Sequence, residues 1–176
     1  FAAPVMAFSL IFFPDDLGKV MALVIFIVAS LTDYLDGFFA RRFNQISSFG
    51  KMLDPIADKV MVVIALCFLN LVHESDYNYL LSVPTVIILF REIFISGLRE
   101  YFGAKNEKFA VKSISKWKTA VQMIAIAVLM ASPITIFNAQ ILFPFGVFLL
   151  WFSTGLTMAT GWWYFQEAVI VIRSEK

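Results

Sequence analysis

The sequence predicts an all-α integral membrane protein, a six-helix bundle whose first helix is truncated and which has a polar cavity facing the cytosol. Hydrophobic residues make up 60% of the 176 residues, and the mean hydropathy of +0.82 is well above that of soluble domains, which are roughly half apolar. Apolar segments of about 20 residues recur along the chain, and this length is enough for a helix to cross a bilayer. Short polar segments separate them.

We expect one partial span and five complete spans, in the ranges 1–13, 18–42, 47–72, 79–102, 115–132 and 139–171. Each should be helical, because the hydrocarbon core offers no water to the backbone and a helix satisfies its own polar groups. The first range is short and has no starting methionine, which predicts truncation of the first helix. No repeat or linker interrupts the chain, so residues 1–176 are expected to form a single membrane domain.

Turn-forming or polar residues close each range in order. The first range ends at residues 14–16, the second at 44–48 and the third at 73–78. The fourth ends at 103–108 and the fifth at 132–133. Glycine and proline punctuate helices and charged side chains avoid the hydrocarbon region, so these five segments are the predicted loops.

Basic residues gather at one end of the bundle if the spans alternate in direction. That end carries Arg41, Arg42, Lys51, Lys105, Lys108, Lys112, Lys116, Arg173 and Lys176. The other end combines a single lysine with four acidic residues, namely Lys19 with Asp15, Asp16, Glu74 and Asp76. Cytoplasmic loops are enriched in Lys and Arg, so the basic end is expected to face the cytoplasm.

Overall charge and cysteine content exclude several kinds of function. The formal net charge of +1 gives no bulk electrostatic basis for binding nucleic acid. The single cysteine, Cys67, excludes an internal disulfide framework and a cysteine-cluster metal site, and its apolar neighbours predict a packing role. The single histidine, His73, falls in a short polar segment and is expected to have no catalytic role. Any charge-based function must therefore come from local placement.

Four aspartates within residues 33–58 give the strongest indication of chemistry. Asp33 and Asp36 are three residues apart and Asp54 and Asp58 four apart, so each pair shares one face of a helix. Clustered carboxylates beside a membrane repel one another and need cations as compensation. Oxygen ligands suit hard ions, so we expect two Mg²⁺ or Mn²⁺ ions that clamp a phosphoryl group during its transfer.

Small and basic residues between these aspartates fit a ligand that carries phosphate. Gly37, Ala40 and Gly50 leave room for a nucleotide or for another backbone, and Arg41 can meet a phosphate. Ordinary helix contact is the alternative role for the small residues. For the aspartates, the alternatives are solvation at helix ends and ion pairing with nearby basic residues.

The complete pattern, D-x2-D-G-x2-A-R-x8-G-x3-D-x3-D, resembles the signature of the CDP-alcohol phosphotransferase family at every fixed position. The resemblance implies a six-helix membrane fold, usually a homodimer, with a polar cavity that faces the cytoplasm. It implies that Asp33, Asp36 and Asp54 bind metal, and that Asp58 both contacts metal and acts as general base. It also implies a set of positions that bind the CDP moiety, namely Asp33, Gly37, Ala40, Arg41 and Gly50.

Residues 53–59, 91–100 and 116–119 resemble the bacterial phosphatidylglycerophosphate synthases within that family, and the likeness extends over about residues 20–130. This implies transfer of a phosphatidyl group from CDP-diacylglycerol to glycerol 3-phosphate, with release of CMP, in the inner membrane of a bacterium. Membrane lipids would surround the protein. The polar first-helix residues of the family are absent here, and the last helix is matched by hydropathy alone.

Cations on the cytoplasmic halves of the later spans favour a phosphorylated acceptor. The side chains expected to hold its phosphate are those of Arg91, Arg99, Lys116 and Lys118. For all of these except Arg91, the alternatives are positive-inside anchoring and contact with anionic lipid headgroups. Glu92 and Glu100 either pair with these cations or help to position the acceptor.

Two other functions remain compatible with the sequence. An enzyme of the same family could use another acceptor, for example phosphatidylglycerol as in a cardiolipin synthase. A cation transporter could use the four aspartates as an ion path, because acidic residues inside membranes mark ion pathways as well as active sites. The fixed Gly-x2-Ala-Arg spacing has no evident use in a transporter, which favours the enzyme.

Overall fold

The computed structural model describes residues 2–13, 15–43, 48–73, 79–103 and 114–174. Within these ranges the chain is helical and contains no strand, and the helices are α1 (Ala2–Phe12), α2 (Asp16–Phe43), α3 (Ser48–Val72), α4 (Tyr79–Gly103), α5 (Ile114–Ala131) and α6 (Ala139–Ser174). Only the backbone is described at positions 34, 36–43, 48–55, 58, 99, 102–103, 114–116 and 174. The all-α, six-helix prediction is confirmed, and each helix end lies within three residues of the predicted one.

Local sequence explains where the last helix begins. The Asn138 side chain accepts a hydrogen bond from the Gln140 backbone N–H at 3.1 Å, and its carbonyl accepts one from Leu142 N–H at 3.0 Å. Asparagine in this position satisfies backbone donors that have no partner inside the helix. Arg173 lies in the last turn, where its positive charge complements the helix dipole.

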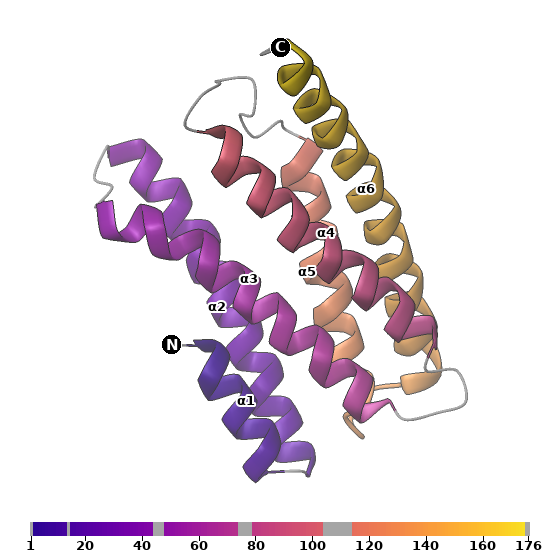
Figure 1. Cartoon of the computed structure of the whole chain (residues 1–176). Helices are drawn as coiled ribbons and strands as arrows, with labels where there is room; N and C mark the ends of the chain where they lie inside the picture. The colour runs from indigo at the N-terminus through magenta and orange to yellow at the C-terminus, as the bar shows by residue number, and fades with distance from the viewer. Residues whose placement is uncertain (1, 14, 44–47, 74–78, 104–113, 175–176) are drawn as a thin grey trace.

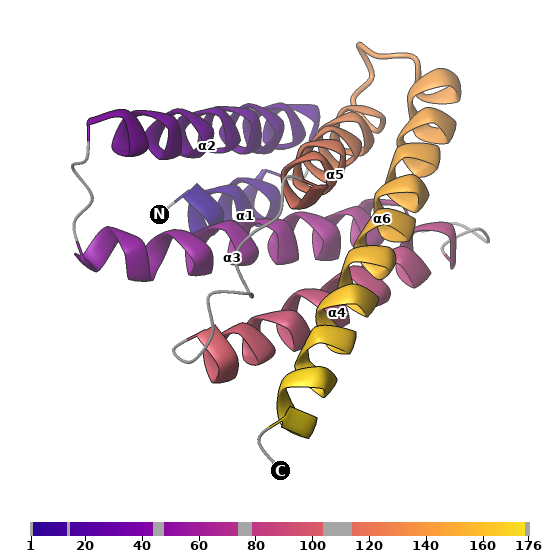
Figure 2. The same ribbon diagram turned by 90° about the horizontal axis from the view of Figure 1, so that it is seen from above.

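Helices α1, α2 and α3 form one group and α4 and α6 another, and the groups meet along α5 and where α3 contacts α4 (Figure 1 and Figure 2). Helix α1 packs against α2 and α3, while α4 packs against α3 and α6. Helix α5 contacts α2, α3 and α6, so it joins the two groups. All six helices contribute to one buried apolar core, which includes Met6, Phe26, Leu66, Ile88, Leu129 and Leu150.

Two of the described segments are long and apolar enough to cross a membrane, Tyr79–Leu98 in α4 and Ala139–Arg173 in α6. Shorter apolar segments cover Ala2–Phe12, Lys59–Val72 and Trp117–Ala131. Many large apolar side chains, such as Phe90 and Phe148, are exposed on the outer surface of the bundle. These features agree with a membrane protein, and the assignment of every helix as a span stays a prediction.

The predicted packing role of Cys67 is wrong, because its side chain is exposed. Its neighbour Leu66 is fully buried, and so is Leu69. Consecutive residues of a helix are rotated by roughly 100° about its axis, which turns Cys67 away from the core that Leu66 enters. The apolar residues around Cys67 in the sequence do not indicate toward which side of the helix its side chain points.

Candidate functional site

The two aspartate pairs lie on consecutive helices. Asp33 and Asp36 are in the second half of α2, and Asp54 and Asp58 are in the first half of α3. The two helices run in opposite directions, with α1 lying between them (Figure 2). The second half of one helix and the first half of the next therefore lie toward the same end of the bundle.

Asp33 is the member of this set whose side chain the structure describes, and it is exposed. The other predicted metal and CDP ligands have side chains outside the description, namely Asp36, Gly37, Ala40, Arg41, Gly50, Asp54 and Asp58. Among the side chains that are described, no group of three or more His, Cys, Asp or Glu could hold a metal ion. The metal and CDP sites stay predictions, and the structure adds the helices on which their residues lie.

A polar arrangement connects three helices through Arg91, Glu92, Lys118 and Thr160, here named the Arg91 cluster. Glu92 Oε1 accepts hydrogen bonds from Arg91 Nη1 at 3.1 Å and from Lys118 Nζ. Arg91 Nη2 donates a further bond to Thr160 Oγ1 at 3.0 Å. Ion pairs thus join α4 to α5, and a hydrogen bond joins α4 to α6.

Both cations of this cluster are buried, with Arg91 6% exposed and Lys118 4% exposed. Buried charges are costly unless they are paired and hydrogen-bonded, and Glu92 supplies the pairing. Within these four residues, one carboxylate is shared by the two cations. Lys59, the residue after Asp58, lies close enough for its charge to act on Glu92, so the cluster is near the α3 segment that bears Asp58.

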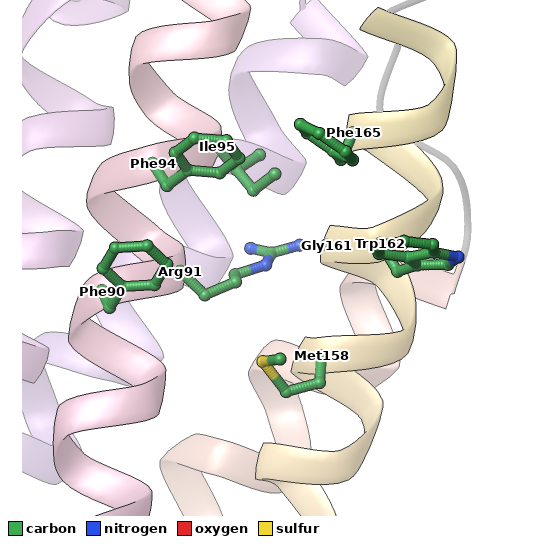
Figure 3. Close-up of a pocket in the computed structure, with 8 residues that line it drawn as sticks. All are labelled: Phe90, Arg91, Phe94, Ile95, Met158, Gly161, Trp162 and Phe165. Atoms are coloured by element: carbon green, nitrogen blue, oxygen red, sulfur yellow. The ribbon is translucent and has the colours of Figure 1, made fainter. Parts of the chain in front are cut away.

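Arg91 also lines a pocket of about 260 Å³ between α4 and α6 (Figure 3). The other lining residues are Phe90, Phe94, Ile95, Met158, Gly161, Trp162 and Phe165. Figure 3 shows the Arg91 side chain reaching from α4 across to α6 at Gly161. A Cβ atom at Gly161 would lie 3.1 Å from Arg91 Cγ and 3.4 Å from Nε, so glycine permits this close crossing.

Two of the four residues predicted to hold an acceptor phosphate, Arg91 and Lys118, are brought together through Glu92. Of the two roles considered for Glu92, the structure shows ion pairing with the cations. The side chains of Arg99 and Lys116 lie outside the description.

Sequence reasoning missed Thr160 and Gly161. The available signal was a recurrence of small residues on α6, which are Ser153, Thr154, Thr157, Thr160 and Gly161. The four hydroxyl-bearing members of this set are buried. Such a face marks close helix contact inside membranes, although it does not say which side chain of another helix will meet it.

A second set of polar contacts, named here the distal contacts, lies at the other end of the bundle. The Asp16 carboxylate accepts bonds from the Thr135 hydroxyl and backbone N–H, and it pairs with Lys19 at 3.2 Å. These bonds, led by the one from the Thr135 hydroxyl, hold the pKa of Asp16 below its usual value. These bonds link the start of α2 to the turn between α5 and α6.

His73 belongs to the distal contacts as well. Its Nδ1 lies 3.1 Å from the Leu69 carbonyl oxygen and its Nε2 lies 2.9 Å from Ser132 Oγ, while its ring stacks on Phe143. Burial lowers the pKa of His73, because the charged imidazolium is poorly solvated there. These contacts join the end of α3 to the turn after α5 and to α6, far along α3 from Asp54 and Asp58.

Comparison with known proteins identifies relatives over nearly the whole chain. A family model described as CDP-alcohol phosphatidyltransferase matches residues 1–172. The chain is similar to the CDP-diacylglycerol--glycerol-3-phosphate 3-phosphatidyltransferase of Cereibacter sphaeroides, with 38% identity over 99% of this chain and 93% of the relative. The protein of the same name from Rickettsia bellii is 37% identical over 85% of this chain and 80% of its own length. A third relative, CDP-diacylglycerol--glycerol-3-phosphate 3-phosphatidyltransferase 2 of Arabidopsis thaliana, is 42% identical over 80% of this chain and 64% of its own length.

Proposed function

Because the chain belongs to the CDP-alcohol phosphatidyltransferase family, we propose that it transfers the phosphatidyl group of CDP-diacylglycerol to glycerol 3-phosphate, giving phosphatidylglycerophosphate and CMP. The observation that carries the proposal is the complete signature, from Asp33 to Asp58, on the consecutive antiparallel helices α2 and α3. The choice of acceptor is supported by the names of the relatives and by the buried cations Arg91 and Lys118.

The proposal includes the setting of the enzyme. Residues 1–176 form one membrane domain whose six helices cross the inner membrane of a bacterium, and the domain is part of a homodimer. The second half of α2 and the first half of α3, which carry the signature, face the cytoplasm, where CMP is released. This orientation is supported by the excess of Lys and Arg in the loops at that end.

The donor set fits divalent metal. Asp33, Asp36, Asp54 and Asp58 offer only carboxylate oxygens, the ligands that Mg²⁺ and Mn²⁺ prefer, and they come in two helix-spaced pairs toward one end of the bundle. These four residues would hold two ions. When bound, such ions polarise phosphoryl oxygens and stabilise the charge that develops on the leaving phosphate.

Asp58 is the proposed general base. It takes the proton from the acceptor hydroxyl, whose oxygen then forms a bond to the phosphorus that bears diacylglycerol. The bond between this phosphorus and the oxygen bridging to CMP breaks, and CMP leaves with that oxygen. Gly37, Ala40 and Gly50 leave space for the CDP moiety, and Arg41 binds its phosphate.

Arg91 and Lys118 are proposed to bind the phosphate of the acceptor, joined by Arg99 and Lys116 from the same helices, α4 and α5. Support comes from the burial of Arg91 and Lys118 and from their shared contact with Glu92, which brings the two cations together. A buried guanidinium binds phosphate oxygens strongly, because two parallel N–H donors match two oxygens and water does not compete.

An acceptor panel tests the proposal. The purified protein in liposomes, with Mg²⁺ and CDP-diacylglycerol, should release CMP rapidly with glycerol 3-phosphate and much more slowly with phosphatidylglycerol, serine or inositol phosphate. Faster release with phosphatidylglycerol would replace this acceptor with that of a cardiolipin synthase. Cation flux across the liposome membrane without any CMP release would instead indicate a transporter.

A further inference from the structure

Helix α6 lies outside the signature, yet it contacts the arginine proposed to bind the acceptor. Thr160 Oγ1 accepts a bond from Arg91 Nη2 at 3.0 Å, and both side chains are buried. The Thr160 hydroxyl proton points to backbone carbonyls of its own helix, those of Leu156 at 2.9 Å and Thr157 at 3.0 Å. The oxygen lone pairs are therefore left facing the guanidinium.

The two terminal nitrogens of Arg91 have different acceptors: Glu92 is negatively charged, whereas Thr160 is neutral. Glu92 holds Nη1 of Arg91 and also Lys118. A carboxylate that captured both terminal nitrogens would form the strongest kind of arginine pair and would neutralise the guanidinium. Thr160 holds the second nitrogen through a neutral hydroxyl, so this contact fixes the direction of the guanidinium and adds no negative charge beside it.

The missing side chain of Gly161 leaves the space through which Arg91 passes. A methyl group there would come within 3.1 Å of Arg91 Cγ, so the arginine would have to shift. Aromatic side chains on both helices, Phe94, Trp162 and Phe165, line the pocket beside this crossing. An apolar environment strengthens the polar bond and makes its direction harder to change.

We propose that Thr160 and Gly161 are positioning residues, which hold the Arg91 guanidinium in the orientation that binds the acceptor phosphate. The inference rests on the proposed function, because it assumes that the acceptor carries a phosphate. Helix α6 then contributes to acceptor recognition through the Thr160 hydroxyl and the space left at Gly161, and neither residue contacts the acceptor.

The test uses steady-state kinetics of the purified enzyme in liposomes. Thr160→Val keeps the side-chain shape and removes the hydrogen-bond acceptor, so the KM for glycerol 3-phosphate should rise roughly ten-fold, as expected for loss of one bond to a charged group. The KM for CDP-diacylglycerol and kcat should stay unchanged, and Thr160→Ser should restore the KM for glycerol 3-phosphate.

Matched controls lie on the same helix. Thr157 is fully buried and, within the described part of the chain, its hydroxyl oxygen has no hydrogen-bond partner, so Thr157→Val should leave both KM values unchanged. Gly161→Ala should raise the KM for glycerol 3-phosphate several-fold by displacing Arg91. A Cβ at Gly155 would meet nothing within 4 Å, so Gly155→Ala should have no such effect. The glycine pair decides the question if Thr160→Val does not fold.

Three outcomes would overturn the inference. An unchanged KM for glycerol 3-phosphate in Thr160→Val and Gly161→Ala would mean that α6 does not position Arg91. Equal increases in both KM values, or a loss that Thr160→Ser does not restore, would indicate a purely structural role. If the wild-type enzyme releases no CMP with glycerol 3-phosphate, the proposed function itself fails, and this inference fails with it.

Discussion

Side-chain contacts join helices in two regions of the molecule, and the ion pairs of the two regions differ in their exposure to water. In the distal contacts, Asp16 and Lys19 remain partly exposed and Thr135 is exposed. In the Arg91 cluster, the cations of Arg91 and Lys118 are almost completely buried. Both regions tie together elements that are far apart in the sequence.

The difference shows what each region contributes. Ion pairs near water stabilise little, because water solvates the separated charges almost as well. A buried charge that loses its partner costs about 3–5 kcal/mol, so a cation is kept in the interior only where something compensates the cost. The distal ion pair, through the bonds of Asp16 to Thr135, links the start of α2 to the turn before α6, whereas the Arg91 cluster keeps charge in the interior, which fits its proposed role in binding the acceptor.

The largest effect is expected outside both regions, at the proposed base. Asp58→Asn should reduce kcat by about 10²–10⁴-fold, because the amide cannot accept the proton of the acceptor hydroxyl. Binding of CDP-diacylglycerol, measured by titration, should be largely retained. Such a result would separate catalysis from both sets of helix contacts. Substantial residual turnover would remove Asp58 from the role of base.

Glu92→Gln tests the buried region directly. The substitution keeps the shape and removes the countercharge of Arg91 and Lys118, so the free energy of unfolding should fall by about 3 kcal/mol. Unfolding of the detergent-solubilised protein, followed by circular dichroism, measures this change. Asp16→Asn is the matched control in the distal contacts and should have a much smaller effect. Equal effects of the two substitutions would contradict the contrast between the regions.

A smaller effect, dependent on pH, is expected at His73. Its pKa is lowered in the folded protein by burial, so the unfolded chain binds a proton more readily. The stabilisation is therefore complete above the ordinary pKa of histidine and is lost as the pH falls through that value toward the lowered one. His73→Gln should flatten the dependence of the unfolding temperature on pH in this window. An unchanged slope would show that His73 titrates normally.

Much of the fold follows from local sequence. The breaks at residues 14–16, 44–48 and 132–133 separate apolar segments, and the helices start and stop close to them. The reason is that an apolar segment in a membrane has helix as its simplest way of satisfying the backbone. The face that each residue presents was harder to predict, as Cys67 shows, because it depends on which neighbours the helix finds.

Residue types and their order along the chain are enough to predict six helices with nearly correct bounds, the signature on two consecutive helices, and Arg91 and Lys118 as cations of interest. Tertiary structure alone decided that Arg91 would meet Thr160, which lies 69 residues further along the chain, and that Glu92 would bridge to Lys118. Residue types and spacings describe one helix at a time. Contacts between helices depend on how whole faces of small and large side chains fit together, and no single segment carries that information.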